Sequence, residues 1–209
     1  MTDPALSIAV PLIAGFEGFT AHPVPDVHKW EIGYGFNYLS DGTAVTAHTP
    51  HMTVAQAQAE LATLAGRVLA AVREMVHVPM ADNQAAALTS FAYNLGTSAL
   101  RTSTLLRLFN AGDAVNAARY FDGYVYAGGK RLAELVSRRA AERALFETPD
   151  GERVAEASAA PNIPVRPAPS NKPVIQRPVD PATGDAADDL NAEVLAGTYK
   201  AAPAGTAGT

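Results

Sequence analysis

The sequence contains no cysteine, which excludes disulfide bonds, thiolate metal ligands and a cysteine nucleophile. It also lacks the run of about 18 apolar residues that a membrane-spanning helix requires, because its apolar segment at residues 8–16 is shorter and contains Pro11. No positive charge precedes that segment, since Asp3 comes before it and Lys29 is the first lysine or arginine of the chain. A secretory signal needs a positive region at this place, so we expect no export signal and synthesis in the cytoplasm.

Positive charge is scarce, and the chain has only five histidines. The 16 lysines and arginines are outnumbered by 21 aspartates and glutamates, which gives a formal net charge of −5 at pH 7. Phosphate binding needs clustered lysines and arginines, so we expect no nucleic-acid partner.

His48 and His51 flank Pro50 in a predicted loop, and no third ligand is evident near them in the sequence. We therefore predict no metal site.

The composition changes near Thr148. Nine of the 15 prolines lie in residues 148–209, and Tyr199 is the only aromatic residue in this segment. A segment of this composition cannot bury enough apolar surface to offset the entropy lost on ordering it. We therefore predict a folded domain over residues 1–147 and a disordered, proline- and alanine-rich tail over residues 148–209.

Helical patterns dominate the second half of the predicted domain. Thr53 and Gln56 match a capping box, and apolar residues then recur at helical spacing as far as Met75. Asp82 is expected to cap the next helix, and Gly96 is expected to end it. Further helices are predicted near residues 99–110, 113–121 and 132–146.

The segment before these helices has a different pattern. After a short helix that ends near Gly15, residues 18–48 are rich in glycine and proline and contain WEIGYGFNYL and SDGTAVT. Aromatic and β-branched residues around Asp41 and Gly42 indicate a β-hairpin. The predicted fold class is α+β, with a small antiparallel β-sheet near the N-terminus packed on a mainly helical bundle. A ligand would lie in the cleft between sheet and bundle.

Three carboxylates, Glu17, Asp26 and Glu31, lie in the stretch GFEGFTAHPVPDVHKWEIGYGF. Glycosidic bonds are cleaved by one protonated carboxyl group, which donates to the leaving oxygen, and one ionised group, which activates water or attacks the sugar carbon. An apolar environment raises a carboxyl pKa, so Glu17, at the end of an apolar helix, is the better candidate for the acid. Asp26, in a predicted loop after two prolines, is the better candidate for the ionised partner. On the alternative interpretation, all three are ordinary surface charges.

Three blocks of the sequence point to a known family. The first is LIAGFEGF followed by Asp26 and WEIGYG, the second is DNQAAALTSFAYNLGTSALRTSTLLRLFNAGD, and the third is YAGGKRLAELVSRRAAERALF. In this order they resemble the phage-type lysozymes, glycoside hydrolase family 24, over about residues 1–147. The resemblance implies a lysozyme-like fold. It also implies a muramidase that hydrolyses the β-1,4 bond between N-acetylmuramic acid and N-acetylglucosamine in bacterial peptidoglycan and so lyses the cell.

The resemblance also implies roles for individual residues. Glu17 matches the family's general acid, and Asp26 matches the carboxylate that, with a threonine, holds and activates the attacking water. Peptidoglycan glycan strands would be the partner, no metal or organic cofactor is implied, and we expect a monomer.

Glu31 departs from the family, because it occupies the place of that threonine, and the spacing from Asp26 is one residue shorter. Glu31 could be the base with Asp26 in support, a nucleophile in a retaining mechanism, or a poorly placed group that lowers activity. A separation of about 5 Å from Glu17 suits direct attack, and about 6.5–9.5 Å leaves room for water. We favour a second-carboxylate role shared by Glu31 and Asp26.

Further candidate residues have simpler alternatives. Tyr34 and Tyr93 could stack on sugars or could be core aromatics, and Asn94 could bind an acetamido group or cap a helix. One arginine of the last predicted helix is expected to orient Glu17, as a family arginine does, but the sequence does not say which. The candidates are Arg138, Arg139 and Arg143.

A non-catalytic function stays open because Glu31 replaces the threonine. The chain would then be a peptidoglycan-binding or virion structural module with a lysozyme fold. As an enzyme of a phage or prophage, it would be made in the host cytoplasm and would act on the cell wall in the periplasm, after a holin or another agent opens the inner membrane. A virion-borne enzyme tethered by the tail is a further alternative.

Overall fold

The computed structural model describes residues 3–26 and 29–149. The predicted tail, residues 148–209, lies outside the described residues except for its first two positions. Within the described part, helices predominate and the strands are short, which confirms the predicted α+β class. Among these residues, none of the helices combines the length and the apolar character needed to span a membrane.

Helix α1 (Pro4–Glu17) begins and ends where its flanking residues favour it. The Asp3 carboxylate accepts a hydrogen bond from the Ala5 N–H at 3.0 Å, and Pro4 occupies a first-turn position where its missing N–H has no cost. The helix extends two residues beyond the predicted end near Gly15, because the left-handed turn comes only at Gly18, whose φ is 69°. Glu17 is therefore the last residue of α1.

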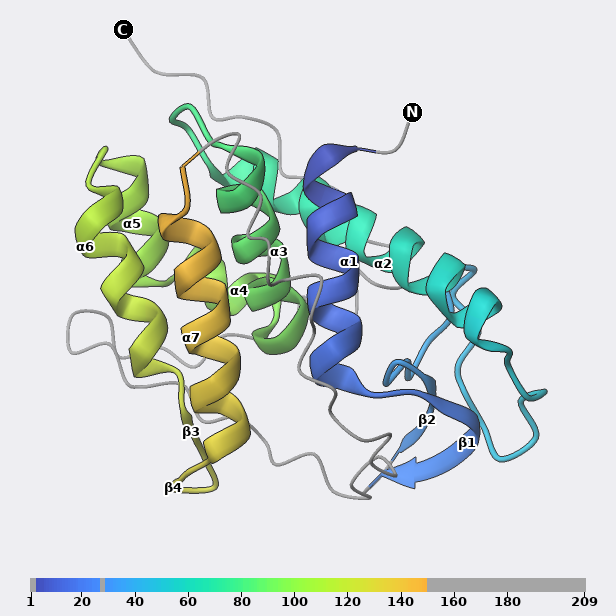
Figure 1. The fold of residues 1–209 in the computed structure, drawn as a ribbon. Coiled ribbons are helices and arrows are strands. Elements are labelled where there is room, and N and C mark those ends of the chain that lie inside the picture. Colours follow the sequence, from blue (N-terminus) through green and yellow to red (C-terminus); the bar gives the residue numbers. More distant parts are fainter. Residues whose placement is uncertain (1–2, 27–28, 150–209) are drawn as a thin grey trace, which may run out of the picture.

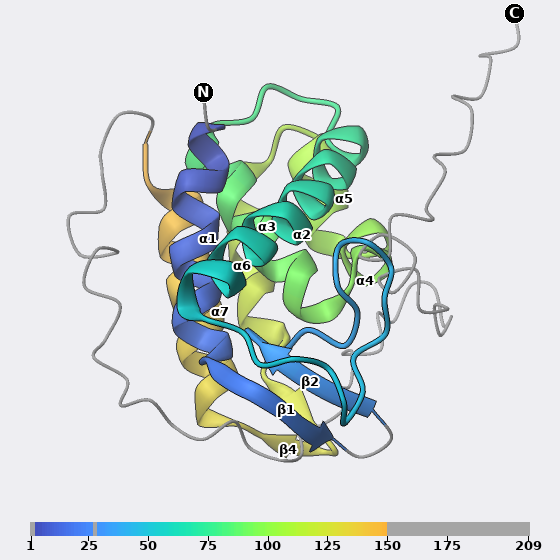
Figure 2. The ribbon, with the colours of Figure 1, turned by 90° about the vertical axis from the view of Figure 1, so that its right-hand side faces the viewer.

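Strands β1 (Thr20–Asp26) and β2 (Lys29–Gly33) form an antiparallel hairpin close to the C-terminal end of α1, as Figure 2 shows. The prediction placed Asp26 in a loop because Pro23 and Pro25 precede it, and this was wrong. A proline cannot donate a ladder hydrogen bond, but both strands of a two-stranded sheet are edges and tolerate it.

The turn predicted at Asp41 and Gly42 is present, with Gly42 at a φ of 87°. It closes a single bridge between Tyr38 and Ala44 rather than two full strands. The β-branched and aromatic pattern therefore indicated the turn correctly, whereas the main partner of β2 is the segment before it.

Helices α2 (Val54–Met75) and α3 (Asp82–Leu95) follow the sequence closely. The capping box is confirmed, because the Thr53 N–H donates to Gln56 Oε1 at 2.9 Å and the Gln56 N–H donates to Thr53 Oγ1 at 3.2 Å. Asp82 is the first residue of α3 and not its cap, a shift of one position. Gly96 ends α3 as predicted, with a φ of 94°.

The rest of the described chain is built from shorter elements and a final long helix. The predicted helix near residues 99–110 is two helices, because Ser103 caps the second with a hydrogen bond from the Leu106 N–H at 3.0 Å. A short hairpin, whose two strands have two residues each, precedes the last helix and was not predicted. The elements are α4 (Thr97–Arg101), α5 (Thr104–Asn110), α6 (Ala114–Arg119), the 3₁₀ helix η1 (Tyr120–Gly123), β3 (Tyr126–Ala127), β4 (Lys130–Arg131) and α7 (Ala133–Glu147).

Helix α3 is the centre of the packing, since it contacts α1, α2 and α7 (Figure 1). Its Phe91 is fully buried and meets the rings of Phe121 and Tyr124 edge to face, at centroid distances of 5.4 and 4.8 Å. Such pairs add to the burial of apolar area that stabilises a core. Both α1 and α7 are thus held against one rigid helix, with the β1–β2 hairpin at the end where α1 stops.

Gly33, at the end of β2, tests the packing that holds the hairpin. Its φ is 64°, and an added Cβ would overlap Cε2 of Phe36, whose side chain is buried. Gly112 is a matched control, because its φ is 83° but an added Cβ would have no neighbour within 4 Å. We expect Gly112→Ala to lower the free energy of unfolding by about 1 kcal/mol. Gly33→Ala should lower it by about 2–4 kcal/mol, because overpacking is added to the strain.

Urea unfolding followed by circular dichroism measures both losses. Equal losses in the two alanine variants would contradict the packing of Phe36 against Gly33.

Candidate active site

Glu17, the predicted acid, ends α1 with a buried ion pair. Nη1 of Arg138 on α7 donates to Glu17 Oε1 at 2.7 Å, and both side chains are almost fully shielded from solvent, with 4% and 6% of their areas exposed. Of the three candidate arginines, Arg138 is the one that contacts Glu17. A bond of this length between buried charges fixes the direction of the carboxylate.

Arg138 also contacts a second carboxylate on its own helix. Its Nε donates to Glu142 Oε1 at 3.1 Å, and its Nη2 donates to the Ser90 carbonyl oxygen at 3.3 Å. The guanidinium lies over the ring of Phe16, with Cζ 5.5 Å from the ring centroid. Burial acts to lower the pKa of Arg138, but the two carboxylates outweigh it and the pKa is raised. Arg138 therefore stays charged.

The other two arginines have different partners. Nη2 of Arg139 donates to Asn94 Oδ1 at 2.9 Å, and its guanidinium lies 5.0 Å from the centroid of the Phe91 ring. Burial lowers the pKa of Arg139 to about 10, which still leaves it charged at neutral pH. Arg143 forms exposed ion pairs with residues on η1 and α7 and does not contact the candidate site.

Tyr93 of α3 links the acid to the hairpin. Burial raises the pKa of Tyr93 well above its ordinary value, the charges of Glu17 and Glu31 raise it further, and Arg138 opposes them. A phenol that responds to both carboxylates has both within electrostatic reach. Glu17 at the end of α1 and Glu31 on β2 thus both act on this residue of α3.

The register of the hairpin places the other two carboxylates together. Val24 pairs with Glu31 and Asp26 pairs with Lys29, with no irregularity between these pairs. Paired residues share a face of the sheet, and so do residues two apart on one strand. Asp26 and Glu31 therefore lie on the same face as diagonal neighbours, a relation that places Cα atoms about 7–8 Å apart.

Glu31 and one oxygen of Asp26 are withdrawn from solvent. Glu31 is 4% exposed, and the Asn37 side-chain amide lies 3.5 Å from its Oε1. Asp26 Oδ1 is buried and accepts no hydrogen bond from the residues that the structure describes. A buried acceptor without a protein donor is costly unless a water or a ligand satisfies it.

The predicted substrate-binding residues separate into two groups. Tyr34 is buried between Phe19 and Phe36, at ring-centroid distances of 5.7 and 6.3 Å, which favours the alternative of a core aromatic. Tyr93 and Asn94 remain partly exposed on α3, beside the carboxylates and the arginines. Because arginine only donates, its bond to Asn94 fixes the amide oxygen toward α7 and the amide nitrogen away from it.

Sequence reasoning missed Glu142 and Ser90. The Ser90 hydroxyl donates to Glu142 Oε1 at 2.7 Å, and neither residue is exposed. The signal was present in RRAAE, because Glu142 follows two arginines by four and three residues, and these spacings place all three on one helix face. Nothing in the sequence indicated that this face would be buried.

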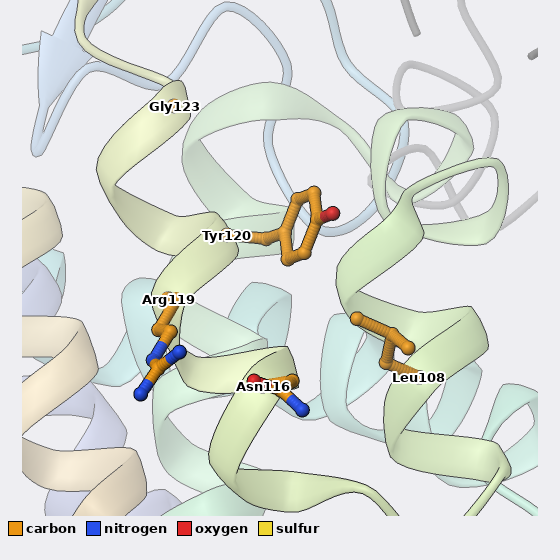
Figure 3. Close-up of a pocket in the computed structure, with 5 residues that line it drawn as sticks. All are labelled: Leu108, Asn116, Arg119, Tyr120 and Gly123. Atoms are coloured by element: carbon orange, nitrogen blue, oxygen red, sulfur yellow. The ribbon is translucent and has the colours of Figure 1, made fainter.

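A hollow of about 600 Å³ lies elsewhere, on α5, α6 and η1 (Figure 3). The side chains of Leu108 and Tyr120 face one another across it, and none of the three carboxylates lines it. It is therefore not the cleft between sheet and bundle that the sequence predicted. In residues 3–26 and 29–149, no group of three or more histidine, aspartate or glutamate side chains is arranged to hold a metal ion.

Comparison with known proteins gives consistent matches. The family model described as phage lysozyme matches residues 14–142. The endolysin of Bacillus phage B103 is 36% identical over 155 residues, which cover 72% of this chain and 56% of that protein, so the chain spans about half the length of this relative. The SAR-endolysin of Enterobacteria phage PA-2 is 33% identical over 146 residues, which cover 66% of this chain and 86% of that protein.

Several solved structures are similar over almost their whole length. The muramidase domain of SpmX from Asticaccaulis excentricus has a TM-score of 0.60 and 34% sequence identity, and the match covers 68% of this chain and 95% of that domain.

Arg138 tests the electrostatics of the site through stability. In Arg138→Met, the buried Glu17 loses the cation that it pairs with and Glu142 loses one of its two, so we expect the free energy of unfolding at pH 7 to fall by about 3–5 kcal/mol. Without the guanidinium the protonated carboxyl forms are favoured, so the deficit should shrink as the pH falls toward 4.

Arg143→Met on the same helix is the control, and its exposed pairs should be worth less than about 1 kcal/mol. Urea unfolding at several pH values measures both. A deficit that is the same for the two variants, or that grows on acidification, would contradict the buried charge pairing.

Proposed function

The chain belongs to the phage lysozyme family, and we propose that it is a muramidase that hydrolyses the β-1,4 bond between N-acetylmuramic acid and N-acetylglucosamine in bacterial peptidoglycan. The observation that carries this proposal is the buried Glu17–Arg138 pair at the end of α1, close to a hairpin that presents two carboxylates on one face. Cleavage of a glycosidic bond needs this combination of an oriented acid and opposing carboxylates.

Glu17 is the proton donor. Its carboxyl group must be protonated to donate to the leaving oxygen, and it becomes a carboxylate as the bond breaks. Arg138, 2.7 Å away, directs the carboxyl group and stabilises the negative charge that develops on it.

Asp26 and Glu31 share the second-carboxylate role. The buried Oδ1 of Asp26 needs a hydrogen-bond donor, and the attacking water is one that would satisfy it. Glu31, as the diagonal neighbour of Asp26 on the same face, can hold the same water or accept its proton. In this arrangement Glu31 replaces the family's threonine by adding a base, and water rather than a carboxylate attacks the sugar.

Tyr93 and Asn94 bind the substrate. They lie next to each other on α3, in the neighbourhood of Glu17, and both are partly exposed. The amide nitrogen of Asn94, turned away from Arg139, is suited to donate to the oxygen of an acetamido group.

The cell wall is the site of action. The endolysin names of the relatives agree with this location. The match covers a larger share of the SAR-endolysin of phage PA-2 than of the endolysin of phage B103. We propose that the protein acts as a monomer on glycan strands, without a nucleic-acid partner, and reaches them from the host cytoplasm after a holin or another agent opens the inner membrane.

Glu17→Gln separates the muramidase from a non-catalytic peptidoglycan-binding module. A glutamine at this position would keep the shape of the side chain but could not donate a proton, so the rate of clearing of permeabilised Gram-negative cells should fall about 10²–10⁴-fold. Glu74→Gln, an exposed change on α2, is the matched control and should clear like the wild type. Clearing by Glu17→Gln at the wild-type rate would rule out the assigned acid.

Glu31→Gln tests the shared role of the hairpin carboxylates. Glutamine fits the buried space and keeps the contact with Asn37, so we expect a folded protein. Because a base is lost, its kcat on peptidoglycan should be lower by about tenfold or more. Glu31→Thr restores the family's residue and should retain more activity than Glu31→Ala.

Proton NMR of the freshly formed product shows which face is attacked. Attack by water predicts the α anomer as first product, and a β anomer would identify a nucleophilic carboxylate instead. Full activity in Glu31→Ala would remove Glu31 from the mechanism.

A further inference from the structure

Glu142 of α7 is a fully buried carboxylate for which the proposed reaction has no direct use. Its Oε1 accepts hydrogen bonds from Ser90 Oγ at 2.7 Å, Arg138 Nε at 3.1 Å and Arg139 Nη2 at 3.2 Å. Its Oε2 lies 3.0 Å from Arg139 Nε without hydrogen-bond geometry, so that contact is electrostatic. A charge buried this deeply persists only because two cations and a hydroxyl surround it.

Each of the two arginines held by Glu142 reaches toward the site. Arg138 donates to Glu17, the assigned acid, at 2.7 Å. Arg139 donates to Asn94, an assigned substrate contact, at 2.9 Å. One carboxylate therefore connects the residue that gives the proton with a residue that binds the sugar, although it contacts neither the substrate nor Glu17.

We propose that Glu142 is a positioning residue that, through Arg138 and Arg139, raises the fraction of Glu17 that holds a proton. This inference rests on the proposed muramidase function. With Glu17 protonated, the cluster contains two positive charges and one negative charge, and ionisation of Glu17 brings it to neutrality. Without Glu142 the two arginines would be uncompensated, and they would favour the ionised form of Glu17, which cannot donate.

Other charged groups face this cluster from several elements. Tyr93 on α3 lies within electrostatic reach of Glu17, and Glu31 on β2 and Glu60 on α2 also act on Tyr93. Tyr124, after η1, acts on Arg139. Changes confined to α7 leave all four groups in place, so a shift in the titration of Glu17 can be assigned to the α7 charges.

The charge argument predicts opposite effects for two neutralising substitutions. The kcat/KM for release of reducing ends from purified peptidoglycan should fall at high pH, as Glu17 loses its proton. In Glu142→Gln this alkaline limb of the pH profile should move to a pH about one unit lower. On the alkaline side of the limb kcat/KM should then be about tenfold below the wild-type value, and on the acidic side it should be near the wild-type value. In Arg139→Gln the limb should move to higher pH, with any loss of the Asn94 contact expressed in KM.

The double variant Arg139→Gln/Glu142→Gln removes one charge of each sign. It should return the limb to its wild-type position, whereas a purely structural role would add the two losses at every pH. Arg143→Gln, on the same helix but outside the cluster, is the control and should leave the profile unchanged.

A titration that needs no activity decides the point independently. Carbon-13 NMR of the Glu17 carboxyl group, identified by its absence in Glu17→Gln, should show a lowered pKa in Glu142→Gln and a raised pKa in Arg139→Gln. If Glu142→Gln does not fold, the other two variants still test the prediction. The pKa of Glu17 should be raised in Arg139→Gln and unchanged in the double variant. Unmoved titrations would overturn the role of Glu142.

The titration also distinguishes this failure from failure of the proposed function. A wild type that does not cleave peptidoglycan ends the muramidase proposal, whereas the Glu17 pKa values still report whether Glu142 controls its proton.

Discussion

The burial of charge at the junction of α1 and α7 is the interaction on which the rest of the structure depends. Arg138 cannot leave water without anionic partners, and Glu17 and Glu142 supply them from two different helices. The guanidinium also lies over the ring of Phe16, 5.5 Å from its centroid, and this contact helps to hold it in place. The ion pair thus fixes the end of α1, and the end of α1 fixes where the acid points.

The β1–β2 hairpin supplies the complementary constraint. Its register alone puts Asp26 and Glu31 on one face, and a slip of one residue would turn one of them to the other side. The bundle therefore orients the acid, and the hairpin orients the opposing carboxylates. Hydrolysis needs both, and in this chain they are built from neighbouring segments at the end of α1.

Local signals in the sequence were reliable where local physics decides the outcome. The capping box at Thr53 and the glycine stop at Gly96 are satisfied by residues within four positions, so the helix ends could be read directly. Strand β1 could not be predicted, because its two prolines argue against a strand unless one already knows that the strand is an edge. The choice of Arg138 as the partner of Glu17, and the role of Glu142, depend on which helix faces pack together. The spacing of residues within α7 does not indicate which of its faces packs against α1 and α3.

The most direct measurement of the central claim is a crystal structure of the Glu17→Gln variant with a bound glycan fragment of peptidoglycan. The account predicts that the side chain at position 17 lies within about 3 Å of a glycosidic oxygen, with Asp26 and Glu31 on the opposite side of the same sugar. A fragment bound only in the hollow beside Tyr120, or one that contacts residue 17 while both hairpin carboxylates face away, would contradict it.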